Sequence, residues 1–298
     1  MKKDHDILRY EGAAAILPLR LRKAALELPP EVQRRAEEFR LRAGRAMTVL
    51  LPEGEVTTEL TVEAEELEIL CDLATEFSRY AAAETLREGY LNVRGGYRVG
   101  LCGTAVIKDG SNTNLKYISS AAVRIGREKV GIADGVGVSL LETGGFRSTL
   151  LLSPPGGGKT TLLRDLVRWL SVRGQRVALI DERGEVAVMY RGAAQMDVGP
   201  HTDVLDGCPK AVGIPMVLRA MNPQIIAVDE ITAEADLRAM SQAAGCGVGL
   251  LATAHGESVE ELQEKPLYRD LLARRVFSRA VRIERNGGER VYTMEKLP

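Results

Sequence analysis

The segment from Ser153 to Thr161 has residue types and a spacing that are typical of a loop that binds phosphate groups. It reads Ser-Pro-Pro-Gly-Gly-Gly-Lys-Thr-Thr and lies between an apolar run at 149–152 and a helical pattern at 161–172. Glycines let backbone N–H groups turn toward phosphate oxygens, and the helix N-terminus adds partial positive charge. The residues predicted to bind a nucleotide are Pro155, Gly156, Gly157, Gly158, Lys159, Thr160 and Thr161.

Two side chains of this loop have predicted roles of their own. Lys159 would bridge the β- and γ-phosphates, and the Thr160 hydroxyl would ligate Mg²⁺. Such loops usually open with glycine, whereas Ser153 stands at that position here. Because residues 156–158 are all glycine, the backbone cradle is retained. The alternative is a glycine-rich turn that happens to carry a lysine.

An acidic pair follows another apolar run, where a parallel sheet would place its ligands. Asp229 and Glu230 come directly after residues 225–228, and such sheets bind ligands outside the carboxyl ends of their strands. We predict that Asp229 holds Mg²⁺ through water and that Glu230 polarises the attacking water as general base. Taken alone, the pair would suit a solvated acidic turn equally well.

Two further strand ends carry polar residues. Asp181 and Glu182 follow the apolar run at 177–180 and could position the water or share the role of base; a structural salt bridge is the alternative. His255 closes the run that begins at Gly249, where a polar group can contact the γ-phosphate. A histidine that only satisfies neighbouring polar groups is the alternative there.

Composition favours a soluble globular protein over a nucleic-acid binder. The 298 residues include 40 Lys and Arg against 41 Asp and Glu, for a formal net charge of -1, and only 4% are aromatic. Nucleic-acid binders usually have a basic excess and stacking aromatics. The 4 cysteines lack the spacing of a zinc site or a disulfide framework. No apolar run reaches the roughly 18 residues of a membrane span, so we expect a cytoplasmic location.

The identity of the nucleotide and the class of function depend on weaker signals. No Asn-Lys-x-Asp sequence, which selects guanine, is present, so ATP is favoured over GTP. A nucleic-acid translocase, a non-hydrolytic nucleotide switch and a small-molecule kinase stay open as rivals. The low charge counts against the first, the pair Asp229 and Glu230 against the second, and the lack of an Arg-rich lid against the third.

The elements that must position this chemistry form an α/β pattern in the second half of the chain. Short apolar runs alternate with helical patterns there, which is typical of a parallel sheet covered on both faces. The runs are 148–152, 176–180, 225–228 and 248–253. Two segments at 276–284 and 290–294, joined around Asn286-Gly-Gly, predict an antiparallel hairpin added to this sheet.

The first half predicts a smaller α+β domain, followed by a glycine-rich separator at 126–145. Amphipathic patterns predict helices, and β-branched or aromatic runs flanked by turn residues predict strands. The helices are expected at 19–28, 31–42 and 63–77, the strands at 47–51 and 117–125, and a hairpin across Gly95-Gly96. We therefore expect an N-terminal domain at 1–126 and an ATPase domain at 127–298.

Several blocks together resemble the stage III sporulation protein AA family. They are residues 95–103, 153–166, 180–186, 197–211, 226–231 and 250–256. That family is similar to the type II/type IV secretion ATPases. The resemblance implies a RecA-like phosphate-loop ATPase domain with a mainly parallel sheet, preceded by a smaller α+β domain, and six chains in a ring.

The resemblance also implies roles for single residues. Lys159 and Thr160 match the phosphate loop, Asp181-Glu182 the acidic box, His255 the histidine box, and Glu230 the catalytic glutamate. Asp229 departs from the glycine that is usual in secretion ATPases, which leaves Glu230 and Glu182 both open as the base.

Secretion ATPases bring arginines from the N-terminal domain to the phosphates, and this family likeness implies the same for the present chain. The candidates are Arg98 and Arg124, and a plain surface or interdomain salt bridge is the alternative for each. The segment 197–211 contains Pro200, Gly207 and Pro209, so we expect an irregular loop that lines the ring centre or a subunit contact.

Together these observations predict a Mg²⁺-dependent ATPase that works as a homohexamer. The resemblance implies that the ring drives a membrane-embedded partner protein in a secretion-like channel between mother cell and forespore. We expect the chain to reach the membrane only through that partner, with no span of its own and no nucleic-acid partner.

Overall fold

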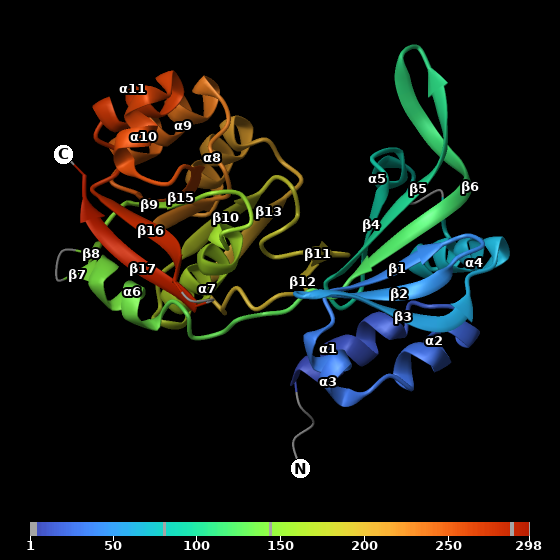
Figure 1. The fold of residues 1–298 in the computed structure, drawn as a ribbon. Coiled ribbons are helices and arrows are strands. Elements are labelled where there is room, and N and C mark those ends of the chain that lie inside the picture. The colour runs from blue at the N-terminus through green and yellow to red at the C-terminus, as the bar shows by residue number, and fades with distance from the viewer. Residues whose placement is uncertain (1–4, 80–81, 143–144, 287–288, 298) are drawn as a thin grey trace. The chain divides into compact units, whose positions relative to one another are not determined.

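The computed structural model describes residues 5–79, 82–142, 145–286 and 289–297. As far as the structure describes it, the chain divides into two compact units, Met1–Arg127 and Glu128–Pro298. Each unit has its own main sheet (Figure 1), and each has its own buried apolar side chains. The glycines at 287–288, predicted as a hairpin turn, lie outside the described residues.

The first unit is an antiparallel sheet with helices packed against it. Among the described residues this sheet has six strands in the order β3-β2-β1-β6-β5-β4. They are β1 (Glu38–Arg42), β2 (Ala46–Leu51), β3 (Gly54–Thr61), β4 (Tyr90–Val93), β5 (Tyr97–Lys108) and β6 (Ser111–Arg124). The helices are α1 (His5–Ala14), α2 (Leu19–Leu26), α3 (Pro30–Arg35), α4 (Ala64–Ala74) and α5 (Ala83–Arg87). The β5–β6 hairpin extends beyond the other strands of its sheet (Figure 1).

One element of this unit was predicted wrongly. The helix expected at 31–42 ends at Arg35, and β1 follows it between β2 and β6. Phe39 and Leu41 are fully buried and alternate with more exposed residues, which is the two-residue period of a strand. The charged residues of this segment gave it a helix-like spacing, but pairing along both edges of β1 decides its conformation.

The expected strand at 47–51, helix at 63–77 and hairpin at Gly95-Gly96 are confirmed, with slightly different ends.

The second unit is a mainly parallel sheet between two layers of helices. Among the described residues its seven strands have the order β13-β10-β14-β15-β9-β16-β17, and only β17 is antiparallel to its neighbour. The strands are β9 (Thr149–Ser153), β10 (Val177–Asp181), β13 (Thr202–Asp206), β14 (Ile225–Val228), β15 (Gly249–His255), β16 (Arg279–Asn286) and β17 (Glu289–Lys296). Short pairs form at β7 (Leu141–Glu142) with β8 (Gly145–Phe146) and at β11 (Met189–Tyr190) with β12 (Ala193–Ala194).

Helices cover both faces of this sheet, as the apolar runs predicted. Their bounds are α6 (Asp134–Leu140), α7 (Lys159–Val172), α8 (Lys210–Ala220), α9 (Glu234–Gly245), α10 (Val259–Glu264) and α11 (Pro266–Ala273). One buried cluster joins the sheet to α6 and α7, and the other joins it to α8, α9, α10 and α11. Every residue of β9, β10 and β14 is buried, because a central strand of such a sheet meets apolar side chains on both faces.

Two expectations for this half need correction. The segment 197–211 is not irregular throughout, because β13 forms within it and pairs in parallel with β10. The glycine-rich separator at 126–145 also contains a helix, α6, which packs on α7. Neither element has a strong period in the sequence, and each is stabilised by a partner that lies far along the chain.

The packing of α6 on α7 depends on the absence of a side chain at Gly137. A Cβ there would come within 2.6 Å of the Trp169 ring, whereas a Cβ at Gly135 in the same helix would meet nothing within 4 Å. We predict that Gly137→Ala lowers the free energy of unfolding by about 1–3 kcal/mol through overpacking. Gly135→Ala should leave it unchanged or raise it by up to about 1 kcal/mol, because alanine favours a helix. Urea unfolding followed by the fluorescence of Trp169, the only tryptophan, would measure both, and equal stabilities would contradict the packing.

Candidate active site

The loop between β9 and α7 has the curvature of a phosphate-binding cradle. Gly156 and Gly158 have φ of 72° and 102°, a left-handed conformation in which only glycine is unstrained. A Cβ at Gly157 would lie 2.3 Å from the Ser153 hydroxyl oxygen, so the serine at the loop entry requires a glycine opposite it. The chain therefore has the bare backbone that close approach of a phosphate needs.

Lys159, the first residue of α7, is buried and turned back onto the end of β9. Its Nζ donates to the carbonyl oxygen of Ser153 at 2.7 Å and of Pro154 at 3.1 Å, and lies 2.8 Å from His255 Nδ1. Burial lowers the pKa of Lys159, while the charges of Glu230 and Asp229 act to raise it. A bound anionic ligand would add negative charge beside this buried ammonium group and so favour its charged form.

Asp229 connects the cradle to the end of β14. Its Oδ2 accepts a hydrogen bond from the Thr160 hydroxyl at 3.2 Å, and its Oδ1 accepts one from the Thr253 hydroxyl at 2.8 Å. A hydroxyl beside a carboxylate is the kind of oxygen donor set that Mg²⁺ uses together with substrate phosphates. The residues predicted to bind the metal, Thr160 and Asp229, are thus in direct contact.

Glu230 belongs to the same cluster and is partly buried. Its Oε1 is 3.0 Å from His255 Nε2, and its Oε2 is 3.2 Å from Arg183 Nη1. Its backbone N–H donates to the Thr253 hydroxyl at 2.9 Å. His255 therefore contacts the phosphate-loop lysine through one ring nitrogen and Glu230 through the other.

The acidic pair after β10, Asp181 and Glu182, has other partners than the pair after β14: neither side chain contacts the phosphate loop in the described structure. Asp181 is buried and accepts hydrogen bonds from the backbone N–H groups of Glu185, Val186 and Ala187. Burial raises its pKa despite these bonds, and the carboxylate shapes the turn that follows β10. Glu182 forms an ion pair with Lys210, a buried lysine at the start of α8. The contacts of Glu182 thus run toward α8.

The two arginines predicted to reach the phosphates lie in the first unit. Arg98 in β5 and Arg124 in β6 are directly opposite each other in the sheet. The Arg98 guanidinium lies over the Tyr90 ring, 3.9 Å from its centroid, and Arg124 is exposed. Their contact with a nucleotide stays a prediction.

The sequence pattern does not predict a role for three residues of this region: Arg183, Lys210 and Arg290. Arg183 directly follows the acidic pair, and Lys210 follows Pro209 at a helix start, so both had weak local signals. Arg290 had none, because only the pairing of β16 with β9 brings it to the phosphate loop.

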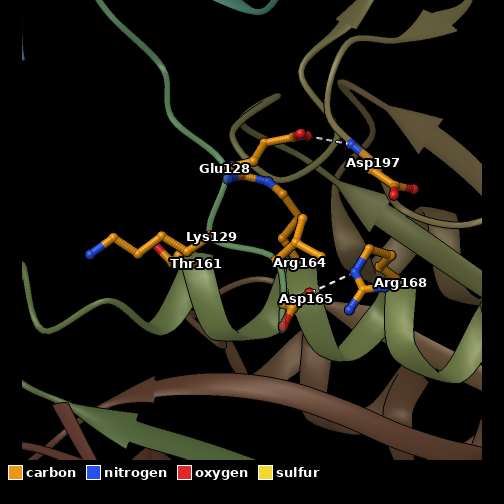
Figure 2. A pocket seen from close by; sticks show the side chains of 8 residues that line it. Glu128, Lys129, Thr161, Arg164, Asp165, Arg168 and Asp197 are labelled. Atoms are coloured by element: carbon orange, nitrogen blue, oxygen red, sulfur yellow. Dashed lines mark hydrogen bonds and ion pairs between the residues drawn. The ribbon is translucent and has the colours of Figure 1, made fainter. Parts of the chain in front are cut away.

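A small cavity lies along α7, beyond the phosphate loop (Figure 2). Thr161, the last residue of the predicted nucleotide-binding set, borders it together with Lys129 and Arg168. Asp165 is buried in its wall, where it accepts hydrogen bonds from Ala133 N–H at 2.8 Å and from Arg168 Nε at 2.6 Å. The aspartate thereby anchors the chain entering the second unit along α7.

The comparison with known families decides where this chain belongs. The family model described as sporulation stage III, protein AA matches residues 8–293. The chain is a member of that family. It is 36% identical over 281 residues to Stage III sporulation protein AA of Bacillus subtilis (strain 168), covering 92% of this chain and 91% of the relative. The resemblance predicted from the sequence blocks is confirmed.

Solved structures confirm the fold of this family member. The Legionella pneumophila ATPase DotB matches with a TM-score of 0.57 at 15% identity, covering 87% of this chain and 76% of DotB. The pilus retraction motor PilT, solved with bound ADP, matches with a TM-score of 0.56 at 16% identity, covering 87% of this chain and 78% of PilT. The mainly parallel α/β unit therefore has the RecA-like fold of secretion ATPases, as predicted.

Thr253 in β15 positions both acidic residues, which gives a direct test of the cluster. The side chain is fully buried, and Thr253→Val keeps its shape while removing the hydroxyl. We predict that the free energy of unfolding falls by about 1–3 kcal/mol, because the Glu230 N–H loses its hydroxyl acceptor and Asp229 loses a donor. Thr253→Ser, which keeps the hydroxyl, should lose less. Urea unfolding of both variants measures this, and a valine variant as stable as the serine variant would contradict the assignment.

Proposed function

We propose that this chain is a Mg²⁺-dependent ATPase whose active site lies between the phosphate loop and the end of β14. The observation that carries the proposal is the contact of the Thr160 hydroxyl with Asp229 at 3.2 Å beside the glycine cradle. This contact joins the proposed polyphosphate site in the loop to Asp229, the carboxylate that we propose as a metal ligand. The ADP bound to PilT, which shares the fold, supports a nucleotide as the ligand.

The residues divide the work between binding and positioning. Gly156 and Gly158 would offer backbone N–H groups to the phosphates. The Gly157 N–H, which donates to the Pro154 carbonyl oxygen at 3.1 Å, and Lys159 would exchange their carbonyl partners for phosphate oxygens. Thr160 and Asp229 would hold Mg²⁺, which when bound neutralises charge on the phosphate oxygens. The carboxylate of Glu230 already lies against His255 and Arg183, so part of the site's charge is paired before a ligand arrives.

Glu230 is the better candidate for the general base. Its carboxylate is held between His255 and Arg183. Glu182, the other candidate, is engaged with the buried Lys210. A base must be within hydrogen-bond reach of the water that it activates, and Glu230 shares its anchoring hydroxyl, Thr253, with the metal-binding Asp229. His255, which contacts both Lys159 and Glu230, would link the phosphates to the base.

We predict that Glu230→Gln retains MgATP affinity but hydrolyses ATP about 10²–10⁴-fold more slowly, because the amide cannot accept the proton of water. Glu182→Gln is the matched control and should retain most of the turnover. Phosphate release measures the rates, and calorimetric titration measures the affinity. Turnover that falls in Glu182→Gln and persists in Glu230→Gln would assign the base to Glu182.

Lys159→Ala serves as the binding control in the same experiments. It removes the cation that is expected to contact the β- and γ-phosphates, so affinity for MgATP should be lost together with turnover. The cradle glycines are unchanged in this variant, so we expect it to fold. If Lys159→Ala unfolds at the same temperature as the unchanged chain, the lost affinity reports a loss of binding and not a loss of folding.

We further propose that the chain acts as a homohexameric ring with two domains, residues 1–126 and 127–298. In the secretion ATPases that it resembles, arginines of the N-terminal domain reach the phosphates, and Arg98 and Arg124 are the candidates here. Arginines of this kind accelerate phosphoryl transfer by about 10³–10⁵-fold. The segment 197–211, which holds β13, is proposed to face the ring centre or a subunit contact.

The ring predicts a definite mass in solution. Light scattering of the full chain with MgATP should give six times the mass of one chain, and Arg124→Ala should keep this mass while lowering turnover. A monomer at high concentration, with and without MgATP, would refute the ring and leave the nucleotide site to be tested by the variants above.

The cellular role follows from family membership. The Bacillus subtilis relative is named for stage III of sporulation, and we propose that this chain powers a secretion-like complex at a membrane during that stage. No helix within the described part of the chain is long and apolar enough to cross a bilayer. A cytoplasmic motor that docks on a membrane-embedded partner is the arrangement we propose.

A further inference from the structure

The hairpin of β16 and β17 runs past the strand that carries the phosphate loop. β16 pairs in parallel with β9, with Arg279 opposite Thr149 and Arg282 opposite Leu152. The β9 strand ends at Ser153, but β16 continues to Asn286 before the chain returns in β17. The end of β16 therefore extends beyond the carboxyl end of β9, where the phosphate loop begins.

Arg290, on the returning strand, is seated on that loop. Its Nε donates a hydrogen bond to the carbonyl oxygen of Gly157 at 3.0 Å. A Cβ added at Gly158 would come within 2.7 Å of its Cζ and Nε and within 2.8 Å of Nη2. The φ of 102° requires glycine at 158, and a larger residue there would also push the guanidinium away from the loop.

The geometry of one peptide unit connects this contact to phosphate binding. The carbonyl of Gly157 and the N–H of Gly158 belong to the same planar trans peptide and point in opposite directions. A donor that holds the carbonyl on one side therefore turns the N–H to the other side. A charged donor makes a stronger hydrogen bond than a neutral one, and a hydrogen bond to a carbonyl polarises its peptide, which makes the N–H a better donor.

We propose that Arg290 is a positioning residue for polyphosphate binding, acting from the same chain as the phosphate loop that it supports. Its guanidinium holds the Gly157–Gly158 peptide with the N–H available to a phosphate oxygen, and adds a positive charge behind the loop. The proposal rests on the proposed nucleotide site. It assigns a cation to that site in addition to Lys159 and independently of Arg98 and Arg124, which belong to the first unit.

The hairpin also offers a matched control. Arg285 is the direct cross-strand partner of Arg290 and is exposed. Removing its side chain changes the hairpin charge by the same amount as removing that of Arg290. Within the described part of the chain, Arg285 makes no hydrogen bond or ion pair with the phosphate loop. A difference between the two variants therefore reports the contact with Gly157 and not the loss of a positive charge in general.

The test is calorimetric titration of MgADP and MgATP into the full chain and its variants. Arg290→Ala should weaken both affinities by about 10–100-fold, the range expected for one hydrogen bond to a charged group, and Arg285→Ala should change them less than threefold. Guanidinium chloride at a millimolar, non-denaturing concentration should restore part of the affinity of Arg290→Ala, and sodium chloride should not. A merely structural role of Arg290 would give no such rescue.

The outcomes separate this inference from the proposed function. If Arg290→Ala binds MgADP and MgATP as tightly as the unchanged chain while Lys159→Ala loses binding, the role of Arg290 is refuted and the nucleotide site is not. An unchanged chain that binds neither nucleotide would overturn both proposals. If Arg290→Ala unfolds, Arg290→Lys carries the test, because lysine keeps the charge and loses the planar donor. That variant should still bind several-fold more weakly, and equal affinity would again refute the inference.

Discussion

The hydroxyl group of Thr253 is the contact on which the candidate site depends. It lies at the end of β15, the strand between β14 and β9, and it donates to Asp229 and accepts from the backbone of Glu230. Asp229 in turn accepts from Thr160 at the start of α7. One buried hydroxyl thus joins the acidic pair to the phosphate loop across a neighbouring strand, and the roles proposed for the metal and the base presuppose this connection.

The charges of the site are arranged as a connected chain. Lys159 contacts His255, and His255 contacts Glu230, which is also paired with Arg183. Burial disfavours the charged form of Lys159 while the nearby carboxylates favour it. Opposite charges already meet in this site, and the phosphate groups and metal ion that we propose as ligands would add charge of each sign to it.

The same sheet supports the phosphate loop from its other side. The β16–β17 hairpin is an addition at the edge of the parallel sheet, yet its length brings Arg290 onto the loop carbonyl of Gly157. Family membership and the RecA-like fold account for the arrangement of the sheet and its helices. The contact of Arg290 with the loop depends on the register of β16 against β9 and of β17 against β16.

The chain's local chemistry by itself determined the phosphate loop, the buried strands and the terminal hairpin, since glycine spacing, apolar runs and turn residues act over a few neighbouring positions. Tertiary structure decided the rest. The segment around Phe39 became a strand because β2 and β6 pair with it, and β13 formed because β10 offered an open edge. The engagement of Glu182 with Lys210 and of Arg290 with the loop likewise depends on strand order and register, and these bring together residues whose separation along the chain leaves no local pattern.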